Sequence, residues 1–220
     1  MERLSPAQIH LRKASAALAH SNEQVLLENL NAYEQMLYLL ARHKKDLKAI
    51  ASMEQRASYK KSILHHYLPW IEGALSAGNG KQDNVLMTWQ VWAVDCAEYH
   101  LALQIAEYAI HQELTLPDGF SRSLCSMLAE EFADAAKKAQ KVQKPFEVSY
   151  LLRVDELTKE KDMPDESRAR LYREIGLLLE TAQPETALNY LERALTLNLN
   201  VGVQGNIKKL RKQLNKADTP

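Results

Sequence analysis

Residues that break helices are scarce in this sequence. Glycine and proline occur seven times each among 220 residues, and residues 31–63 contain neither. No run of alternating apolar and polar residues bounded by turn pairs predicts a strand. Hydrophobic residues make up 46% and charged residues 25% of the chain, which is the composition of a folded protein rather than a disordered one. The sequence therefore predicts an all-α, multi-helical fold.

Capping and turn residues divide the chain into helices. Ser5-Pro6-Ala7-Gln8 combines an N-cap, a first-turn proline and a glutamine, which predicts a helix from Ser5 to about His20. Apolar residues at intervals of three, four and seven predict a long amphipathic helix within residues 31–63. Proline breaks the pattern at Leu68-Pro69-Trp70. Further helices are expected up to about Ala77, where Gly78-Asn79-Gly80 follows, and over 83–94, 98–112, 121–141, 145–161 and from 163 onward.

Residues 172–198 resemble one tetratricopeptide repeat. Gly176 and Ala187 match the small positions of its two helices, with a spacing one residue shorter than that pattern. A single repeat cannot bury its own apolar face, so this hairpin must pack on neighbouring helices or on another subunit. We predict a packed helical hairpin, and a peptide-binding groove is the alternative.

Charge is segregated along the chain, although 28 basic and 28 acidic residues give a net charge of zero. Residues 42–61 hold seven basic and two acidic residues, and residues 62–136 hold two basic and ten acidic residues. The last fifteen residues hold five basic residues and one acidic residue. On a helix, Lys44, Lys48 and Arg56 would lie near one stripe, which suits a phosphate backbone. A solvated helix face is the alternative interpretation.

Membrane and secretion signals are missing from the sequence pattern. The longest apolar runs are far shorter than the roughly 20 residues that cross a bilayer, and the first residues show no basic-then-apolar signal pattern. We expect an intracellular protein without a membrane partner. Cys96 and Cys125 stand alone, without zinc-ligand spacing, and are expected to be buried thiols.

Two groups of residues invite a binding interpretation that their spacing does not support. Gly78-Asn79-Gly80-Lys81-Gln82 has neither the upstream glycine nor the serine or threonine of a Walker phosphate loop. His43, His65 and His66 lack the spacing of a metal-ligand motif. We therefore expect no metal site from these residues.

Acidic and aromatic residues of the middle segment also have simpler roles. A metal nuclease needs clustered carboxylates, and Asp83, Asp95 and Glu98 are candidates only through their proximity in sequence. Trp89 and Trp92 lie among aliphatic residues, which indicates a buried helix rather than a platform for base stacking. No catalytic residue is predicted.

Short stretches from one end of the chain to the other form an ordered set. They are Ser5-Pro6-Ala7-Gln8 with His10 and Arg12, Tyr33-Glu34-Gln35-Met36-Leu37, Leu47-Lys48-Ala49-Ile50, Leu68-Pro69-Trp70, Gln82-Asp83, Leu86-Met87-Thr88, Trp92, Asp95, Ala102-Leu103, Ile105-Ala106, Tyr108-Ala109, Leu114-Thr115, Pro117, Met163-Pro164-Asp165-Glu166, Arg168-Ala169, Gly176-Leu177 and Gly202-Val203. Together they resemble the small terminase subunit family of peduovirus-type temperate tailed phages, which is described as the terminase endonuclease subunit.

The resemblance implies a role in DNA packaging. The small subunit of this family recognises the end-joining (cos-type) site of the genome and directs the large ATPase subunit to cut concatemeric DNA and package it into proheads. It implies double-stranded phage DNA and the large subunit as partners, a homo-oligomeric ring, and the bacterial host cytoplasm as the location. Magnesium and ATP are expected for the holoenzyme, and no cofactor is expected for this chain.

The resemblance and the charge pattern together give two sets of candidate DNA-binding residues. Side chains of the first helix would read base edges, and the basic segment would contact phosphates. The first set is Gln8, His10, Arg12 and Lys13, and the second set is Arg42, Lys44, Lys45, Lys48, Arg56, Lys60 and Lys61.

Three regions are expected along the chain. Residues 1–63 would recognise DNA, residues 64–144 would form the acidic oligomerisation region, and residues 145–220 would dock the large subunit. Because the residues show no nuclease motif, we expect cleavage to belong to the assembled terminase. Two alternatives stay open: the chain is an endonuclease in its own right, or it is a helical-repeat adaptor that binds proteins only.

Overall fold

The computed structural model describes residues 31–117 and 119–217, and within these residues it contains only helices and no strand. This confirms the predicted all-α fold, whereas the helix expected from Ser5 to His20 lies outside the described residues. The α-helices are α3 (Ala32–Ala49), α4 (Met53–Ile63), α5 (Leu68–Ala77), α6 (Asn84–Asp95), α7 (Tyr99–His111), α8 (Leu124–Lys141), α9 (Val148–Thr158), α10 (Asp165–Leu179), α11 (Pro184–Leu197) and α12 (Gln204–Ala217), and a 3₁₀ helix covers Leu64–His66.

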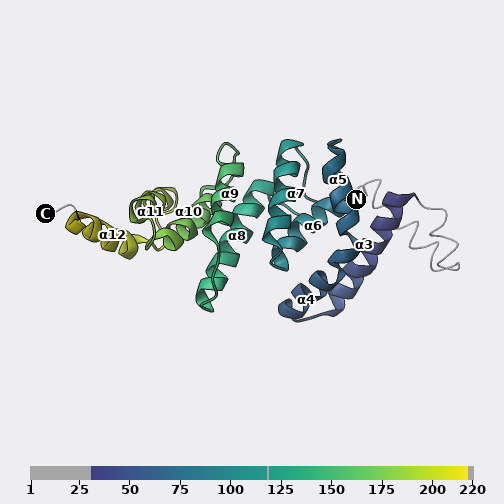
Figure 1. Cartoon of the computed structure of the whole chain (residues 1–220), viewed down its shortest axis with the longest axis horizontal. Helices are drawn as coiled ribbons and strands as arrows, with labels where there is room; N and C mark the ends of the chain where they lie inside the picture. The colour runs from purple at the N-terminus through teal and green to yellow at the C-terminus, as the bar shows by residue number, and fades with distance from the viewer. Residues whose placement is uncertain (1–30, 118, 218–220) are drawn as a thin grey trace.

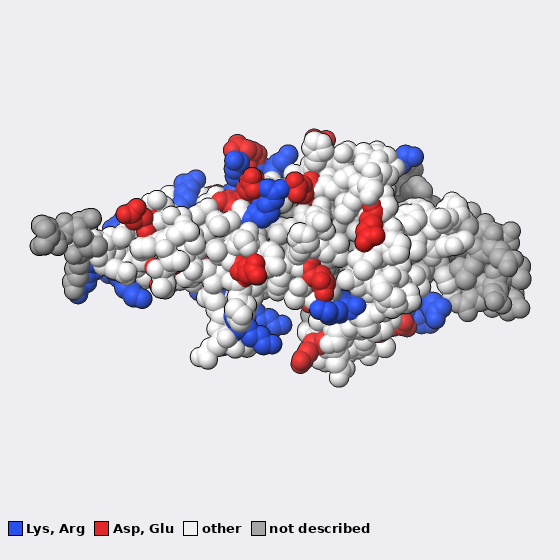
Figure 2. Space-filling model, viewed as in Figure 1, with Lys and Arg blue, Asp and Glu red and all other residues white. Residues whose placement is uncertain are grey.

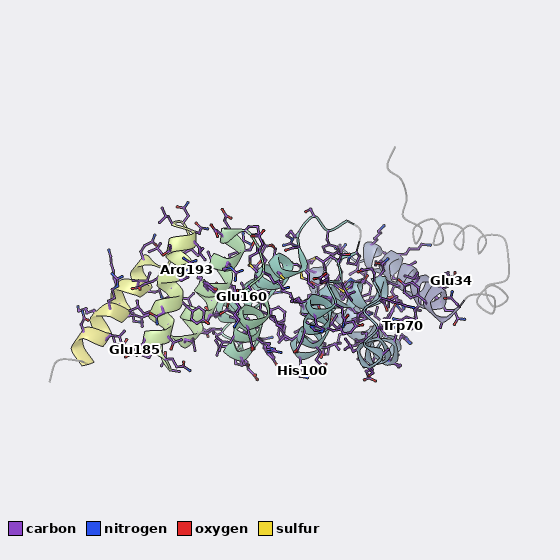
Figure 3. All side chains as sticks on the ribbon, turned by 90° about the horizontal axis from the view of Figure 1, so that it is seen from above. Glu34, Trp70, His100, Glu160, Glu185 and Arg193 are labelled. Atoms are coloured by element: carbon purple, nitrogen blue, oxygen red, sulfur yellow. The ribbon has the colours of Figure 1, made fainter. Side chains whose placement is uncertain are left out.

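The helices follow one another along an elongated molecule, from α3 and α4 at one end to α12 at the other (Figure 1). Most helices pack mainly on helices that are near them in chain order, such as α6 on α7, α8 on α9 and α10 on α11, whereas α3 and α4 pack on α6. The view from above shows Glu34 and Trp70 towards one end and Glu185 and Arg193 towards the other (Figure 3). No described helix has the length and hydropathy needed to span a membrane.

Helix α6 is the centre of the N-terminal half. Its residues from Val85 to Gln90 are buried on every side, which fits a helix enclosed by other helices. The ring of Trp89 lies 5.0 Å from that of Tyr67 and 5.4 Å from that of Trp92, measured between centroids. The prediction that both tryptophans belong to a buried helix is therefore confirmed, because Trp89 is 0% and Trp92 is 7% exposed.

The single amphipathic helix expected within residues 31–63 is instead two helices. Helix α3 ends at Ala49, and Ile50 and Ser52 adopt extended backbone angles before α4 begins at Met53. The Ser52 side chain caps α4 by accepting a hydrogen bond from Gln55 N at 3.3 Å. The second helix therefore begins at a serine cap. The sequence has no glycine or proline there that would indicate a break between two helices.

Helices α10 and α11 form a closely packed pair. A Cβ atom added to Gly176 of α10 would lie 2.5 Å from Leu191 Cδ2 and 3.1 Å from the backbone oxygen of Ala187 in α11. Only glycine therefore allows this approach of the two helices. The hairpin is present, while its assignment as a tetratricopeptide repeat stays a prediction.

Candidate nucleic-acid interface

A basic pocket lies where α3, α4 and α6 meet the segment that follows α7. Its volume is about 320 Å³, and four of the candidate phosphate-binding residues line it: Lys44 and Lys48 from α3, and Arg56 and Lys60 from α4. The break at Ile50 turns the chain between these helices, so cations from two elements face one hollow. We call this hollow the basic pocket.

Lys44 is fixed on one wall of the basic pocket. Its ammonium group donates a hydrogen bond of 3.3 Å to Thr88 Oγ1, and Thr88 Oγ1 in turn donates to the backbone oxygen of Asn84 at 2.7 Å. Burial lowers the pKa of Lys44 from its ordinary value, because the charged form loses hydration. An anion placed in the pocket would favour the charged form of Lys44.

Arg56 holds the turn between the two helices and also lines the pocket. Its Nε donates a hydrogen bond of 2.6 Å to the backbone oxygen of Ile50, the C-cap residue that follows α3. The guanidinium group is planar and carries five donors, so this bond leaves other N–H groups for an anion. Arg56 is therefore both a structural residue and a cation of the pocket.

Lys60 and Lys61 are neutralised by acids from the neighbouring segment. Lys60 pairs with Asp95, and its ammonium group also lies 5.6 Å from the centroid of the Trp92 ring. Lys61 pairs with Glu98 at 2.9 Å, and this hydrogen bond raises the pKa of Lys61. In the part of the chain that the structure describes, Lys44 and Lys48 have no acidic partner.

The remaining wall of the basic pocket is apolar. Phe120 and Trp92 are its aromatic residues. Phe120 is 43% exposed, whereas Trp92 is mostly buried. A backbone hydrogen bond of 3.4 Å from Phe120 N to Pro117 O closes the turn that carries the phenyl group. The other apolar lining residues are Leu47, Val91 and Pro117. Phe120 was not predicted from the sequence, since a lone aromatic residue in a loop carries no periodic signal.

Other candidate residues lie away from the basic pocket or outside the described chain. Gln8, His10, Arg12 and Lys13 precede Asn31, the first residue that the structure describes. Arg42 and Lys45 are exposed on α3 and do not line the pocket. Figure 2 shows Lys and Arg side chains mixed with Asp and Glu over the visible face, without a continuous basic surface. The basic segment contributes Lys44, Lys48, Arg56 and Lys60 to the basic pocket.

The three acids that are candidate metal ligands form hydrogen bonds or ion pairs within the protein. Asp83 caps α6, Asp95 pairs with Lys60, and Glu98 pairs with Lys61. Within residues 31–117 and 119–217, no three side chains of histidine, cysteine, aspartate or glutamate come together as a possible metal site.

The histidines and cysteines belong to the packing of the helices. His43 Nδ1 lies 2.7 Å from Tyr67 Oη, and the ring of His43 stacks on that of His66. Both cysteines are free, and Cys96 is buried as expected. Cys125 is only partly buried, so the prediction of a buried thiol was wrong for this residue, which lies at the start of α8.

Comparison with known proteins gives the family of this chain. The model of the phage small terminase subunit family matches residues 37–166, which contain the whole basic pocket. The chain belongs to the phage small terminase subunit family. It is 39% identical over 217 residues to the "Terminase, endonuclease subunit" of Escherichia phage P2, covering 98% of this chain and 88% of that protein.

A second relative of this small terminase subunit matches a shorter part. The "Probable terminase, endonuclease subunit" of Haemophilus phage HP1 (strain HP1c1) is 25% identical over 122 residues, which are 55% of this chain and 40% of that protein. No solved structure matches the chain. The resemblance predicted from the sequence is thus confirmed at the level of the family.

Proposed function

We propose that this small terminase subunit binds double-stranded phage DNA at the end-joining (cos-type) site and directs the large ATPase subunit to cut and package it. The observation that supports the proposal is the basic pocket, which is lined by Lys44, Lys48 and Arg56 and by the ion-paired Lys60. Phosphate contacts supply most of the affinity of a protein for DNA and fix its position on the duplex.

The lack of acidic partners for two cations of the basic pocket favours an anionic ligand. Lys44 and Lys48 have no acidic partner among the described residues. A phosphate oxygen would give both ammonium groups a charged acceptor. Arg56 adds further donors beside them. These three residues are our candidates for the phosphate contacts.

We also propose that several copies assemble into a ring around or beside the DNA. A chain with zero net charge has no general attraction to DNA, so one pocket would bind weakly. Repeating the pocket by cyclic symmetry would bring several phosphate sites to one duplex and raise the affinity through multivalency. The region 64–144 is our candidate for contacts between copies, and its helix α6 and the segment after α7 line the basic pocket.

The C-terminal region is our candidate for docking the large subunit. Leu199, in the turn between α11 and α12, is 73% exposed, so an apolar side chain is accessible to a partner there. It lies in the proposed docking region 145–220. We expect Leu199→Glu to weaken association with the large subunit, measured by co-purification or by calorimetry, while the affinity for DNA stays unchanged.

The experiment for DNA binding compares two matched charge reversals. Lys48→Glu changes a cation of the pocket, and Lys138→Glu makes the same change on an exposed residue of α8 outside the pocket. We expect Lys48→Glu to weaken binding to end-joining-site DNA at least tenfold and to reduce the salt dependence by about one phosphate contact. Lys138→Glu should bind within twofold of the wild type. Equal affinities of the two variants would exclude the basic pocket as the DNA site.

A second candidate function is endonuclease activity of the chain itself. The names of the two relatives favour it, because the first is called a terminase endonuclease subunit and the second a probable one. The test incubates the purified chain with magnesium, without the large subunit, on end-joining-site DNA and on a scrambled duplex. Binding without strand breaks would assign cleavage to the assembled terminase, as we propose. Metal-dependent breaks at the site would make the chain an enzyme in its own right.

A further inference from the structure

The basic pocket combines two chemistries that a contact to duplex phosphates does not need together. Its cations, Lys44, Lys48 and Arg56, suit a phosphate group. The rest of its lining wall is apolar and carries Phe120, an aromatic residue that is 43% exposed. In a regular duplex the bases are stacked and paired, so their flat faces cannot reach such a wall. The pocket therefore fits a ligand that offers an anion and a flat apolar face at the same time.

The size of the pocket agrees with such a ligand. The pocket is an open hollow, and its volume of about 320 Å³ lies at the lower end of the range of small-molecule sites. A phosphate oxygen touching a surface lysine needs no hollow of this size. An unpaired nucleotide has both required parts, because its phosphate is an anion and its base presents an aromatic face.

A backbone hydrogen bond closes the turn that carries Phe120. Gly119 has a φ of +99°, a conformation that glycine adopts freely, and Phe120 N donates to Pro117 O. The neighbouring Arg122 pairs with Glu130 and Glu131 on α8, so its charge is directed elsewhere. Phe120 is thus left as the aromatic member of this turn that faces the pocket.

We propose that the basic pocket holds one unpaired nucleotide of the phage DNA, with its base against Phe120 and its phosphate among Lys44, Lys48 and Arg56. This inference rests on the proposed function, because it assumes that DNA is bound through the same pocket. It adds that the subunit prefers DNA in which a base has left the stack. An acidic protein segment with an apolar side chain is the competing occupant, and the test below separates the two.

The experiment measures the affinity of the full-length wild-type chain for two DNAs of the same end-joining sequence. One is fully paired, and the other has one additional unpaired nucleotide. We expect the second DNA to bind at least about fivefold more tightly, which is the lower end of what stacking a base on an aromatic side chain gives. Phe120→Ala should bring this affinity ratio to about one, and Phe120→Trp should retain it. Val142→Ala, at another exposed apolar residue, should leave the ratio unchanged.

A fluorescent base provides a direct readout of stacking. With 2-aminopurine at the unpaired position, binding of the wild type should quench the fluorescence, and binding of Phe120→Ala should quench it much less. If Lys48→Glu weakens binding but the two DNAs bind equally to the wild type, the proposed function stands and this inference is wrong. If neither DNA binds through the pocket, both are wrong. If Phe120→Ala loses the large subunit and keeps the affinity ratio, the occupant is a protein segment.

Discussion

Trp70 Nε1 donates a hydrogen bond of 2.8 Å to one carboxylate oxygen of Asp83, and the other oxygen of Asp83 caps α6. This second oxygen accepts from Val85 N at 2.8 Å and from Leu86 N at 3.0 Å. One carboxylate therefore ties the first turn of α5 to the start of the buried helix α6. Its oxygens are engaged in holding the fold, which gives Asp83 a structural role rather than that of a metal ligand.

We predict that Asp83→Ala lowers the free energy of unfolding by about 2 kcal/mol, since it removes a helix cap and one further hydrogen bond. Asp83→Asn keeps an oxygen for the cap and should lose about half as much. Urea denaturation of both variants measures the difference. A variant with wild-type stability that has lost metal-dependent DNA cleavage would show instead that Asp83 binds a metal.

The ion pair between Lys60 and Asp95 gives a second prediction. Asp95→Asn removes a negative charge beside the basic pocket and leaves the Lys60 charge available to DNA. We expect the affinity for end-joining-site DNA at low salt to rise about fivefold, because a unit charge at ~4 Å contributes about 1 kcal/mol in water. Fluorescence anisotropy at two salt concentrations measures this change. A loss of DNA binding would contradict the placement of DNA in the pocket.

Close packing of α10 on α11 gives a third prediction. Gly176→Ala places a Cβ atom against Leu191 and the backbone of Ala187, so we expect a loss of about 1 to 3 kcal/mol in the free energy of unfolding. Gly205→Ala on α12 is the matched control, since nothing lies within 4 Å of its added Cβ. It should be neutral or stabilising by up to about 1 kcal/mol. Equal effects would show that α10 and α11 can move apart.

The buried contact between His43 and Tyr67 gives a prediction about pH. Burial lowers the pKa of His43, and the charge of His66 lowers it further, while Asp46 acts in the opposite direction and Arg42 adds a small lowering effect. The folded chain therefore favours the neutral ring. Stability is complete above the ordinary imidazole pKa of about 6.5 and falls as the pH drops from there towards the lower folded-state pKa.

Denaturation of the wild type at pH 7.5 and at pH 5.5 measures this loss. His43→Gln has no titrating ring, so we expect it to lose less stability over the same interval. The control is His100→Gln, at an exposed residue of α7, which should behave as the wild type does. A wild-type stability that is independent of pH in this interval would contradict the assigned effect of burial.

Local signals in the sequence located most of the helices. Pro69 lies in the first turn of α5, Gly78 ends that helix in a left-handed conformation, and Asp83 caps α6. Each of these residues acts on backbone atoms a few positions away, so the sequence contains the whole signal. The break at Ile50 was missed because Ser52 was overlooked as a cap in a stretch without glycine or proline.

The candidate site was predictable only in part. Lys44, Lys48 and Arg56 stand at helical spacing within one segment, and the structure brings them to one hollow. Phe120 joins them from 64 residues beyond Arg56, and Asp95 neutralises Lys60 from 35 residues away. Such contacts depend on how α6 packs against α3 and α4. Charge counts along the chain carry no information about that packing.

The order of the helices along the molecule has a consequence for synthesis. Because most helices pack mainly on helices close to them in the chain, most contacts between residues close short loops, and closing a short loop costs little entropy. The basic pocket needs no residue beyond Phe120. We therefore expect its walls to assemble on the ribosome while α8 to α12 are still being translated, so that the nascent chain holds a folded anion site before its C-terminal half exists.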